Sequence, residues 1–148
     1  MAPLLLAPYF LLPGSFSLEM TMPKNGMILL VHGSRDEAWM EPFEAMAAAV
    51  AKRSPDTLVR IDCLQFCSPD VEAAARALAA EGAQRITIVP VFFSARGHVL
   101  RDVPGAIARA RADFPDVPMT VVGTLGEQPE VEEGMVAALV RMAKEDRS

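Results

Sequence analysis

Short apolar runs alternate with longer segments of helical periodicity four times from residue 27 onward. The runs are rich in β-branched residues, as strands are, while the longer segments repeat apolar residues every three or four positions. Strands that alternate with helices predict βαβ units, in which each helix crosses over one face of a parallel sheet. The first run, residues 27–31, is apolar throughout, which is typical of a strand covered on both faces. We therefore predict an α/β fold with three layers, α/β/α, around a mainly parallel four-stranded sheet.

The predicted strands lie at four places along the chain, residues 27–31, 58–64, 86–93 and 119–122. The first helix is expected to begin at Asp36 or Glu37 and to end before Ser54. Ser68 is expected to cap the second helix, which Gly82 ends. The last helix carries apolar residues on one face, namely Val131, Met135, Leu139 and Met142.

The chain of 148 residues suits one domain with a sizeable core and is too short for two ordinary ones. Prolines break the apolar runs of the first 26 residues, which lack both the length of a membrane span and the basic start of a secretory signal. We expect residues 1–26 to be a poorly ordered appendage or an over-extended start, and residues 27–148 to form the domain. A nucleic acid is not an expected partner, because the net charge of −5 provides no concentrated basic face. A membrane is not an expected partner either, because the apolar runs are too short to span one.

The two cysteines, Cys63 and Cys67, are four residues apart. If one strand ran through both, they would be separated by roughly 13 Å, which is beyond the reach of a disulfide. Their spacing also differs from the C-x-x-C pattern of structural zinc sites. We expect two small, buried or half-buried thiols in a reducing compartment, the cytoplasm.

The only two histidines, His32 and His98, both come shortly after a predicted strand. His32 follows the first strand directly, and His98 lies in the loop after the third. The carboxyl ends of parallel strands meet at one edge of a sheet and form its ligand crevice, so both imidazoles should reach the same edge. Imidazole accepts protons near neutral pH and is the commonest neutral metal ligand. The pair therefore predicts proton transfer or metal binding at this edge.

The segment after the first strand, His32-Gly33-Ser34-Arg35-Asp36, places an imidazole, a hydroxyl, a cation and a carboxylate in a row. A turn followed by a helix cap would explain the same residues without any catalytic role. Two other enzyme classes are disfavoured. Histidine phosphatases need an arginine directly before the histidine, where this chain has Val31, and α/β-hydrolases need a G-x-S-x-G elbow that this chain lacks.

Arginines gather in the same two loops of this acidic chain, at Arg35, Arg96 and Arg101. Planar guanidinium groups pair well with carboxylates and phosphates, so a polyanionic small molecule is the expected ligand. Two alternatives stay open: any of these arginines could be an ordinary solvated residue, and a histidine in a loop could be solvated or could cap a helix.

In these segments the chain resembles the short CbiX-type members of the class II tetrapyrrole chelatases, the CbiX/SirB group. The resemblance covers residues 27–145 and is most specific at 32–36 and at 89–104, which are separated by a complete βα unit. It implies a chelatase-like half-domain that inserts a divalent metal into sirohydrochlorin, a precursor of cobalamin and sirohaem. The implied metal is Co²⁺, with Ni²⁺ or Fe²⁺ as alternatives, and it is a substrate, so no permanently bound cofactor is implied.

The resemblance also assigns roles to individual residues. His32 and His98 match the two family histidines, which hold the metal and take the pyrrole protons. The residues implied to bind the substrate are Ser34, Arg35, Gln65, Ser94 and Arg96. Short members of the family pair as homodimers, so that two copies enclose the macrocycle. A cytoplasmic homodimer with a tetrapyrrole substrate is therefore implied.

One position departs from the family pattern. Many relatives have an acidic residue after the second strand where this chain has Gln65, and a neutral amide cannot accept a proton or neutralise a cation. Glu127 or Cys67 could supply the missing ligand. Two alternatives to catalysis by a chelatase follow: a tetrapyrrole or metal carrier that does not complete insertion, and, less favoured, a phosphate-ester enzyme that uses the same histidines and arginines.

Overall fold

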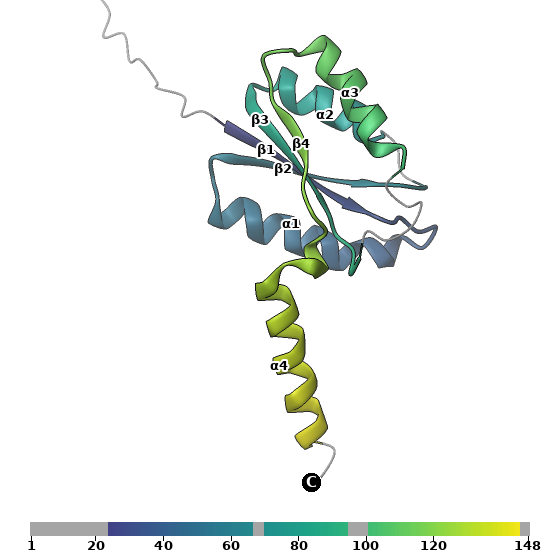
Figure 1. Ribbon diagram of the computed structural model, residues 1–148, viewed down its shortest axis with the longest axis vertical. Helices are drawn as coiled ribbons and strands as arrows, with labels where there is room; N and C mark the ends of the chain where they lie inside the picture. Colours follow the sequence, from purple (N-terminus) through teal and green to yellow (C-terminus); the bar gives the residue numbers. More distant parts are fainter. Residues whose placement is uncertain (1–23, 67–69, 95–100, 146–148) are drawn as a thin grey trace, which may run out of the picture.

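Four parallel strands form one sheet in the order β2-β1-β3-β4 (Figure 1). The structure is a computed structural model that describes residues 24–66, 70–94 and 101–145. The strands are β1 (Lys24–Val31), β2 (Thr57–Cys63), β3 (Ala83–Pro90) and β4 (Met119–Val121). Every pairing between neighbours is parallel. The predicted α/β class and the parallel four-stranded sheet are confirmed.

Helices cover both faces of the sheet, as the βαβ pattern predicted. The helical segments are η1 (Glu37–Met40), α1 (Glu41–Arg53), α2 (Val71–Ala80), α3 (Val103–Asp113), η2 (Leu125–Glu127) and α4 (Pro129–Glu145). Helices α2 and α3 lie side by side on one face, and α1 lies on the other (Figure 1). Helix α4 starts where β3 and β4 end and projects away from the body (Figure 1). None of the described helices is long and apolar enough to cross a membrane.

The core is on the side of the sheet that α2 and α3 cover. Ile28 and Leu30 of β1 and Ile88 of β3 are fully buried there against Leu78 of α2. Alternate residues of a strand share a face, so the other residues of these strands point toward α1. Fully burying one such side chain contributes roughly 1.5–3 kcal/mol. Helix α1, in contrast, has no buried residue, so most of the packing free energy comes from one face.

The expected bounds of the strands and the expected cap of the second helix differ from the structure. Strand β1 begins at Lys24 instead of residue 27, and β3 spans Ala83–Pro90 instead of 86–93. Both strands extend into polar residues at their amino ends, because ladder hydrogen bonds do not require apolar side chains. The cap of α2 is Asp70, whose carboxylate accepts a hydrogen bond from the Ala73 N–H at 2.9 Å. The expected cap, Ser68, and the appendage up to residue 23 lie outside the described residues.

The end of β3 is held by η2. The Gly126 N–H donates to the Phe92 carbonyl at 2.8 Å. A Cβ on Gly126 would lie 2.4 Å from the Phe93 Cα, so only glycine fits at this contact. Phe92 therefore leaves the sheet ladder to bind η2, which explains why β3 ends earlier than its apolar pattern predicted. The same contact determines where α4 begins.

The prediction for the cysteines was wrong at Cys63, which is disulfide-bonded. That prediction assumed a continuous strand through both cysteines, but β2 ends at Cys63. Phe66 then adopts a positive φ of 67°, so the backbone leaves the extended conformation on which the expected distance rested. The other cysteine of the chain, Cys67, lies outside the described residues.

Candidate active site

His32 directly follows β1 at the carboxyl edge of the sheet, and its side chain is exposed. Its ring packs edge-on against Phe92, with ring centroids 6.1 Å apart and an interplanar angle of 79°. Phe92 follows β3, the neighbour of β1 in the sheet. An aromatic contact therefore links the ends of two adjacent strands and orients the imidazole while leaving it accessible.

The backbone after β1 lies tightly against the backbone after β2. Gly33 has a φ of +89°, and a Cβ at this position would lie 1.9 Å from the Gln65 carbonyl oxygen. The Gln65 N–H donates to the His32 carbonyl at 3.2 Å, and the Leu64 N–H donates to the Val31 carbonyl at 2.9 Å. Only glycine allows this approach. The structure thus brings Gln65 beside His32. Both residues were predicted from the sequence to belong to the site.

The rest of the 32–36 segment forms a turn and a cap. The Ser34 hydroxyl accepts from the Asp36 N–H, and the Asp36 carboxylate accepts from the Ala38 N–H, each at 3.1 Å. The alternative of a turn followed by a helix cap is therefore confirmed for Ser34 and Asp36. Arg35 differs, because its guanidinium lies 5.1 Å from the centroid of the Phe66 ring. Both side chains are exposed, so this cation–π contact orients Arg35 at the protein surface.

The loop after β3 contributes Ser94 to the same edge. Its hydroxyl donates to the Glu127 carboxylate of η2 at 3.3 Å. Glu127, one suggested source of the missing negative charge, therefore lies at this edge too. Arg96 and His98 lie outside the described residues, so the pairing of His32 with His98 stays a prediction. Within the described ranges, no three His, Cys, Asp or Glu residues cluster closely enough to hold a metal ion.

An apolar hollow of about 240 Å³ adjoins His32 through Phe92. It is lined by Phe43, Val91, Phe92, Phe93, Leu125, Gly126, Val131 and Met135. Three of these residues follow β3, and the others come from α1, η2 and α4. Phe93 is 77% exposed, so the apolar surface continues to the outside. A flat, largely apolar ligand could rest here within reach of the imidazole.

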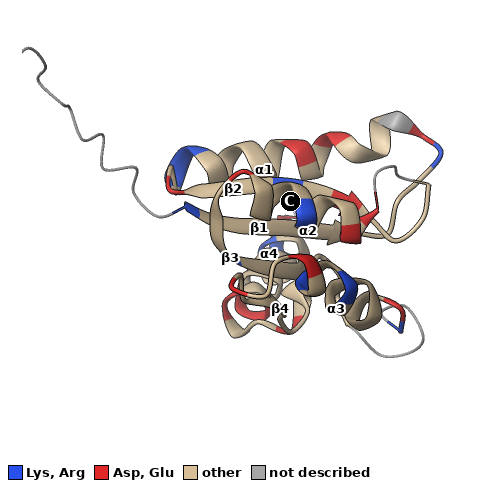
Figure 2. Cartoon of the chain, turned by 90° about the horizontal axis from the view of Figure 1, so that it is seen from above, with Lys and Arg blue, Asp and Glu red and all other residues tan. Residues whose placement is uncertain are grey.

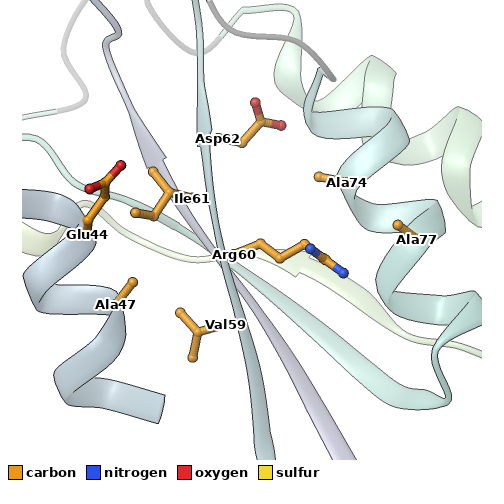
Figure 3. Close-up of a pocket in the computed structure, with 8 residues that line it drawn as sticks. All are labelled: Glu44, Ala47, Val59, Arg60, Ile61, Asp62, Ala74 and Ala77. Carbon is orange, nitrogen blue, oxygen red and sulfur yellow. The ribbon is translucent and has the colours of Figure 1, made fainter. Parts of the chain in front are cut away.

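A larger hollow of about 500 Å³ runs along the outer edge of β2, between α1 and α2 (Figure 3). Its walls include three alanines, and its charged residues are Glu44, Arg60 and Asp62. Arg60 is paired with Glu81, so its charge is already compensated. This groove contains neither His32 nor the segment that follows it. We therefore place the candidate site at the carboxyl edge and not in the larger hollow.

Asp62 is a residue that sequence reasoning missed. It is 2% exposed, and Figure 3 shows its carboxylate on the side of β2 that faces α2. One oxygen accepts from the Cys63 N–H at 2.7 Å, and the other, Oδ2, has no hydrogen-bond partner among the residues that the structure describes. Burial raises the pKa of Asp62 to about 6, against the hydrogen bond from Cys63 and with a further increase from the Asp70 carboxylate. An acidic residue within a predicted strand was the available signal.

Charges elsewhere are mixed. In Figure 2, acidic and basic residues are interspersed over the described helices. An anionic ligand would therefore have to be held by individual arginines such as Arg35. The parallel sheet, the accessible imidazole and the apolar hollow are features of α/β proteins that bind small molecules at the carboxyl edge of the sheet.

The particular family follows from comparison with known sequences. The CbiX family model matches residues 26–142, so the chain belongs to the CbiX family. The resemblance stated from the sequence is thus confirmed at the level of the family. The match places both the 32–36 segment and the loop after β3 inside the shared region.

Curated relatives carry the name sirohydrochlorin cobaltochelatase. The protein of Sulfolobus acidocaldarius is 32% identical over 82 residues, which cover 55% of this chain and 65% of that relative. The protein of Methanosarcina acetivorans is 28% identical over 110 residues, which cover 70% of this chain and 85% of the relative. The chain thus spans just under two-thirds of the length of the first of these relatives.

Two solved structures show the same fold. A putative cobalamin biosynthesis CbiX protein from Marinobacter aquaeolei VT8 matches with a TM-score of 0.71 and 24% identity. The match covers 86% of this chain and all of that one. The sirohydrochlorin chelatase SirB from Bacillus subtilis subspecies spizizenii, in complex with cobalt, matches with a TM-score of 0.58 and 24% identity. This match covers 66% of the present chain and 42% of SirB.

Proposed function

We propose that this protein inserts a divalent cation, Co²⁺ before Ni²⁺ or Fe²⁺, into sirohydrochlorin. Membership of the CbiX family and the names of the curated relatives support this reaction. The structural observation that carries the proposal is the accessible His32 imidazole, which packs on Phe92 beside an apolar hollow. No observation favours the phosphate-ester alternative.

His32 and His98 hold the incoming cation and accept the protons that the macrocycle loses. Insertion exchanges two pyrrole N–H protons for one divalent cation, which sheds water as ring nitrogens bind it. A neutral imidazole has one lone pair that can bind either the metal or a proton, and an ordinary imidazole titrates near pH 6.5. These two events suit a pair of histidines that act on the same ring.

Arg35 and Arg96 bind the carboxylates on the rim of the macrocycle, and Ser34, Gln65 and Ser94 contribute polar contacts. Arg35 is supported by its cation–π contact with the Phe66 ring, which restricts the positions of the guanidinium. A guanidinium restricted in this way loses less side-chain entropy when it pairs with a carboxylate. The apolar hollow beside Phe92 takes part of the macrocycle's face.

The cation is a substrate here, so the proposal includes no resident cofactor. Two imidazoles bind Ni²⁺, Cu²⁺ or Zn²⁺ at least as tightly as Co²⁺, so intracellular supply determines the physiological metal. The proposal further includes a homodimer that encloses the macrocycle. It also includes a cytoplasmic location, which rests on the family resemblance alone because Cys63 is disulfide-bonded.

The experiment is an insertion assay with sirohydrochlorin and Co²⁺, Ni²⁺ or Fe²⁺, followed by absorbance. We expect the spectrum of the metal complex to appear faster than in the reaction without protein. A carrier function is the second candidate, because Gln65 supplies a neutral amide where the family resemblance implies an acidic residue in many relatives. A carrier would shift the spectrum on binding and leave the insertion rate at the spontaneous value, which would contradict the chelatase proposal.

A further inference from the structure

Helix α4 presents a row of apolar side chains that its own chain leaves exposed. Among them, Leu139 is 65% exposed, Met142 57%, and Val136 and Val140 each 49%. The helix has no buried residue, packs chiefly against η2 and projects from the body (Figure 1). Burial of each such side chain would contribute roughly 1.5–3 kcal/mol. Four large apolar side chains on one projecting helix indicate an interaction surface.

The position at which α4 leaves the protein determines where a partner bound to its apolar side chains must lie. The helix follows η2, and η2 is bound to the end of β3 by the hydrogen bond from Gly126 to Phe92. Phe92 is also the residue against which His32 packs. The helix therefore leaves the protein from the edge that carries the candidate active site, and a partner that covers α4 lies beside that site.

The charges of α4 favour a second copy of the same helix. Glu130, Glu132 and Glu133 make its first half acidic. Arg141, Lys144 and Glu145 lie toward its end and leave that half with a net positive charge, although Arg141 is paired with Glu145 at 3.1 Å. In an antiparallel pair the acidic half of each helix adjoins the basic half of the other. A parallel pair would place like charges side by side. Packed helices are about 8–10 Å apart, which is close to the Debye length at physiological salt. Charges on the two helices therefore still interact, and their interaction energy favours the antiparallel pair over the parallel pair.

The helix is also large enough for a specific contact. Seventeen residues give a helix about 26 Å long and about 10 Å wide. Two such helices, with the surfaces that they cover, bury on the order of 1,000 Å², the lower limit for a specific interface. An antiparallel pair of identical helices has a two-fold axis, so the contact closes and does not extend into a fibre.

We propose that α4 pairs in antiparallel orientation with α4 of a second copy, through Leu139, Met142 and their apolar neighbours. The pairing brings the carboxyl edges of the two sheets toward each other. The inference rests on the homodimer of the proposed function and identifies its contact surface. Each candidate site is then bordered by a helix of the other copy.

The experiment measures the mass in solution by light scattering during size-exclusion chromatography. The wild-type chain should elute with twice the monomer mass. The double variant Leu139→Glu, Met142→Glu should raise the dissociation constant of the dimer at least 100-fold, because four charges would be buried at the contact. The control is Ala137→Glu, which adds a charge to the same helix about 160° around the axis from Leu139 and about 140° from Met142. It should weaken the dimer far less than the double variant does.

Hydrogen exchange of the unmodified chain provides a second measurement that needs no variant to fold. Amides of residues 136–144 should become more protected as protein concentration rises through the dissociation constant. A double variant that stays dimeric, or exchange in α4 that is independent of concentration, would overturn the inference. A wild-type chain that is monomeric at about 100 μM would overturn it as well. Metal insertion is measured separately, so a failure of the interface is distinguishable from a failure of the chelatase function.

Discussion

Asp62 of β2 pairs in register with Leu30 of β1, which lies two residues before His32. The Asp62 carboxylate is therefore buried in a row of apolar side chains. Burial of this carboxylate disfavours its charged form, and no group in the described ranges forms a hydrogen bond with its Oδ2. The raised pKa has a direct consequence for stability. A group that binds its proton more tightly in the folded chain than in the unfolded chain stabilises the fold only while it is protonated.

For Asp62 the pKa rises from 3.8 to about 6. Its contribution is fully present below about pH 4 and is lost as the pH rises through 6, because ionisation then favours the unfolded chain. We predict that Asp62→Asn removes about 2–3 kcal/mol of the difference in unfolding free energy between pH 4 and pH 8. Urea denaturation of both proteins at the two pH values measures this. The exposed Asp116→Asn is the control, and a wild-type pH dependence in Asp62→Asn would refute the assignment.

Gly33 is expected to be intolerant of any side chain. Its φ is positive, and a Cβ here would lie only 1.9 Å from the Gln65 carbonyl oxygen, so the loops after β1 and β2 would have to move apart. Gly33→Ala should lower the free energy of unfolding by about 3 kcal/mol and reduce metal insertion, because His32 adjoins this contact. Gly105→Ala is the matched control. Its Cβ would lie 3.7 Å from the nearest atom, Arg109 Nη1, and it should leave both properties close to wild type.

Gln65 offers a gain-of-function test. Its backbone is hydrogen-bonded to His32 and its side chain is exposed, so a carboxylate there would lie at the candidate site. Gln65→Glu should tighten Co²⁺ binding severalfold, measured by calorimetry, and should raise the insertion rate. Gln84→Glu, a substitution of the same kind at an exposed position near the amino end of β3, is the control. Equal affinity in Gln65→Glu and wild type would show that this position does not face the cation.

Arg35 should act on substrate binding more than on turnover. Its guanidinium lies over the Phe66 ring and is exposed, as a group that captures carboxylates would be. Arg35→Ala should raise KM for sirohydrochlorin about tenfold and change kcat less, because one ion pair is lost from the bound state. Arg53→Ala, at the far end of α1, is the control. A loss confined to kcat would contradict this role.

The parallel sheet was predictable from the sequence. Its strands are apolar runs, and the helices between them provide the crossovers that parallel strands need. Family membership was predictable from two short segments around His32 and His98. The helix at 129–145 was also predictable, but the surface against which its apolar side chains pack was not. The apolar stripe of α4 indicates that something covers it, and periodicity does not say which surface does so.

Other features depend on three-dimensional register. The burial of Asp62 follows from its pairing with Leu30, which no local pattern specifies. The end of β3 depends on Gly126, which is 34 residues away from Phe92 in the sequence. The bonded state of Cys63 was missed because the extended strand was assumed to continue beyond it. The position of His98 is still a prediction, since that residue lies outside the described ranges.

The central claim is that His32 and His98 carry out metal insertion at one edge of the sheet. The most direct test is the initial rate of Co²⁺ insertion into sirohydrochlorin by wild type, His32→Ala and His98→Ala at equal concentrations, with circular dichroism to verify folding. Loss of a group that transfers protons costs about 10²–10⁴-fold, so both variants should fall by at least 100-fold. Full activity in both folded variants would contradict the claim.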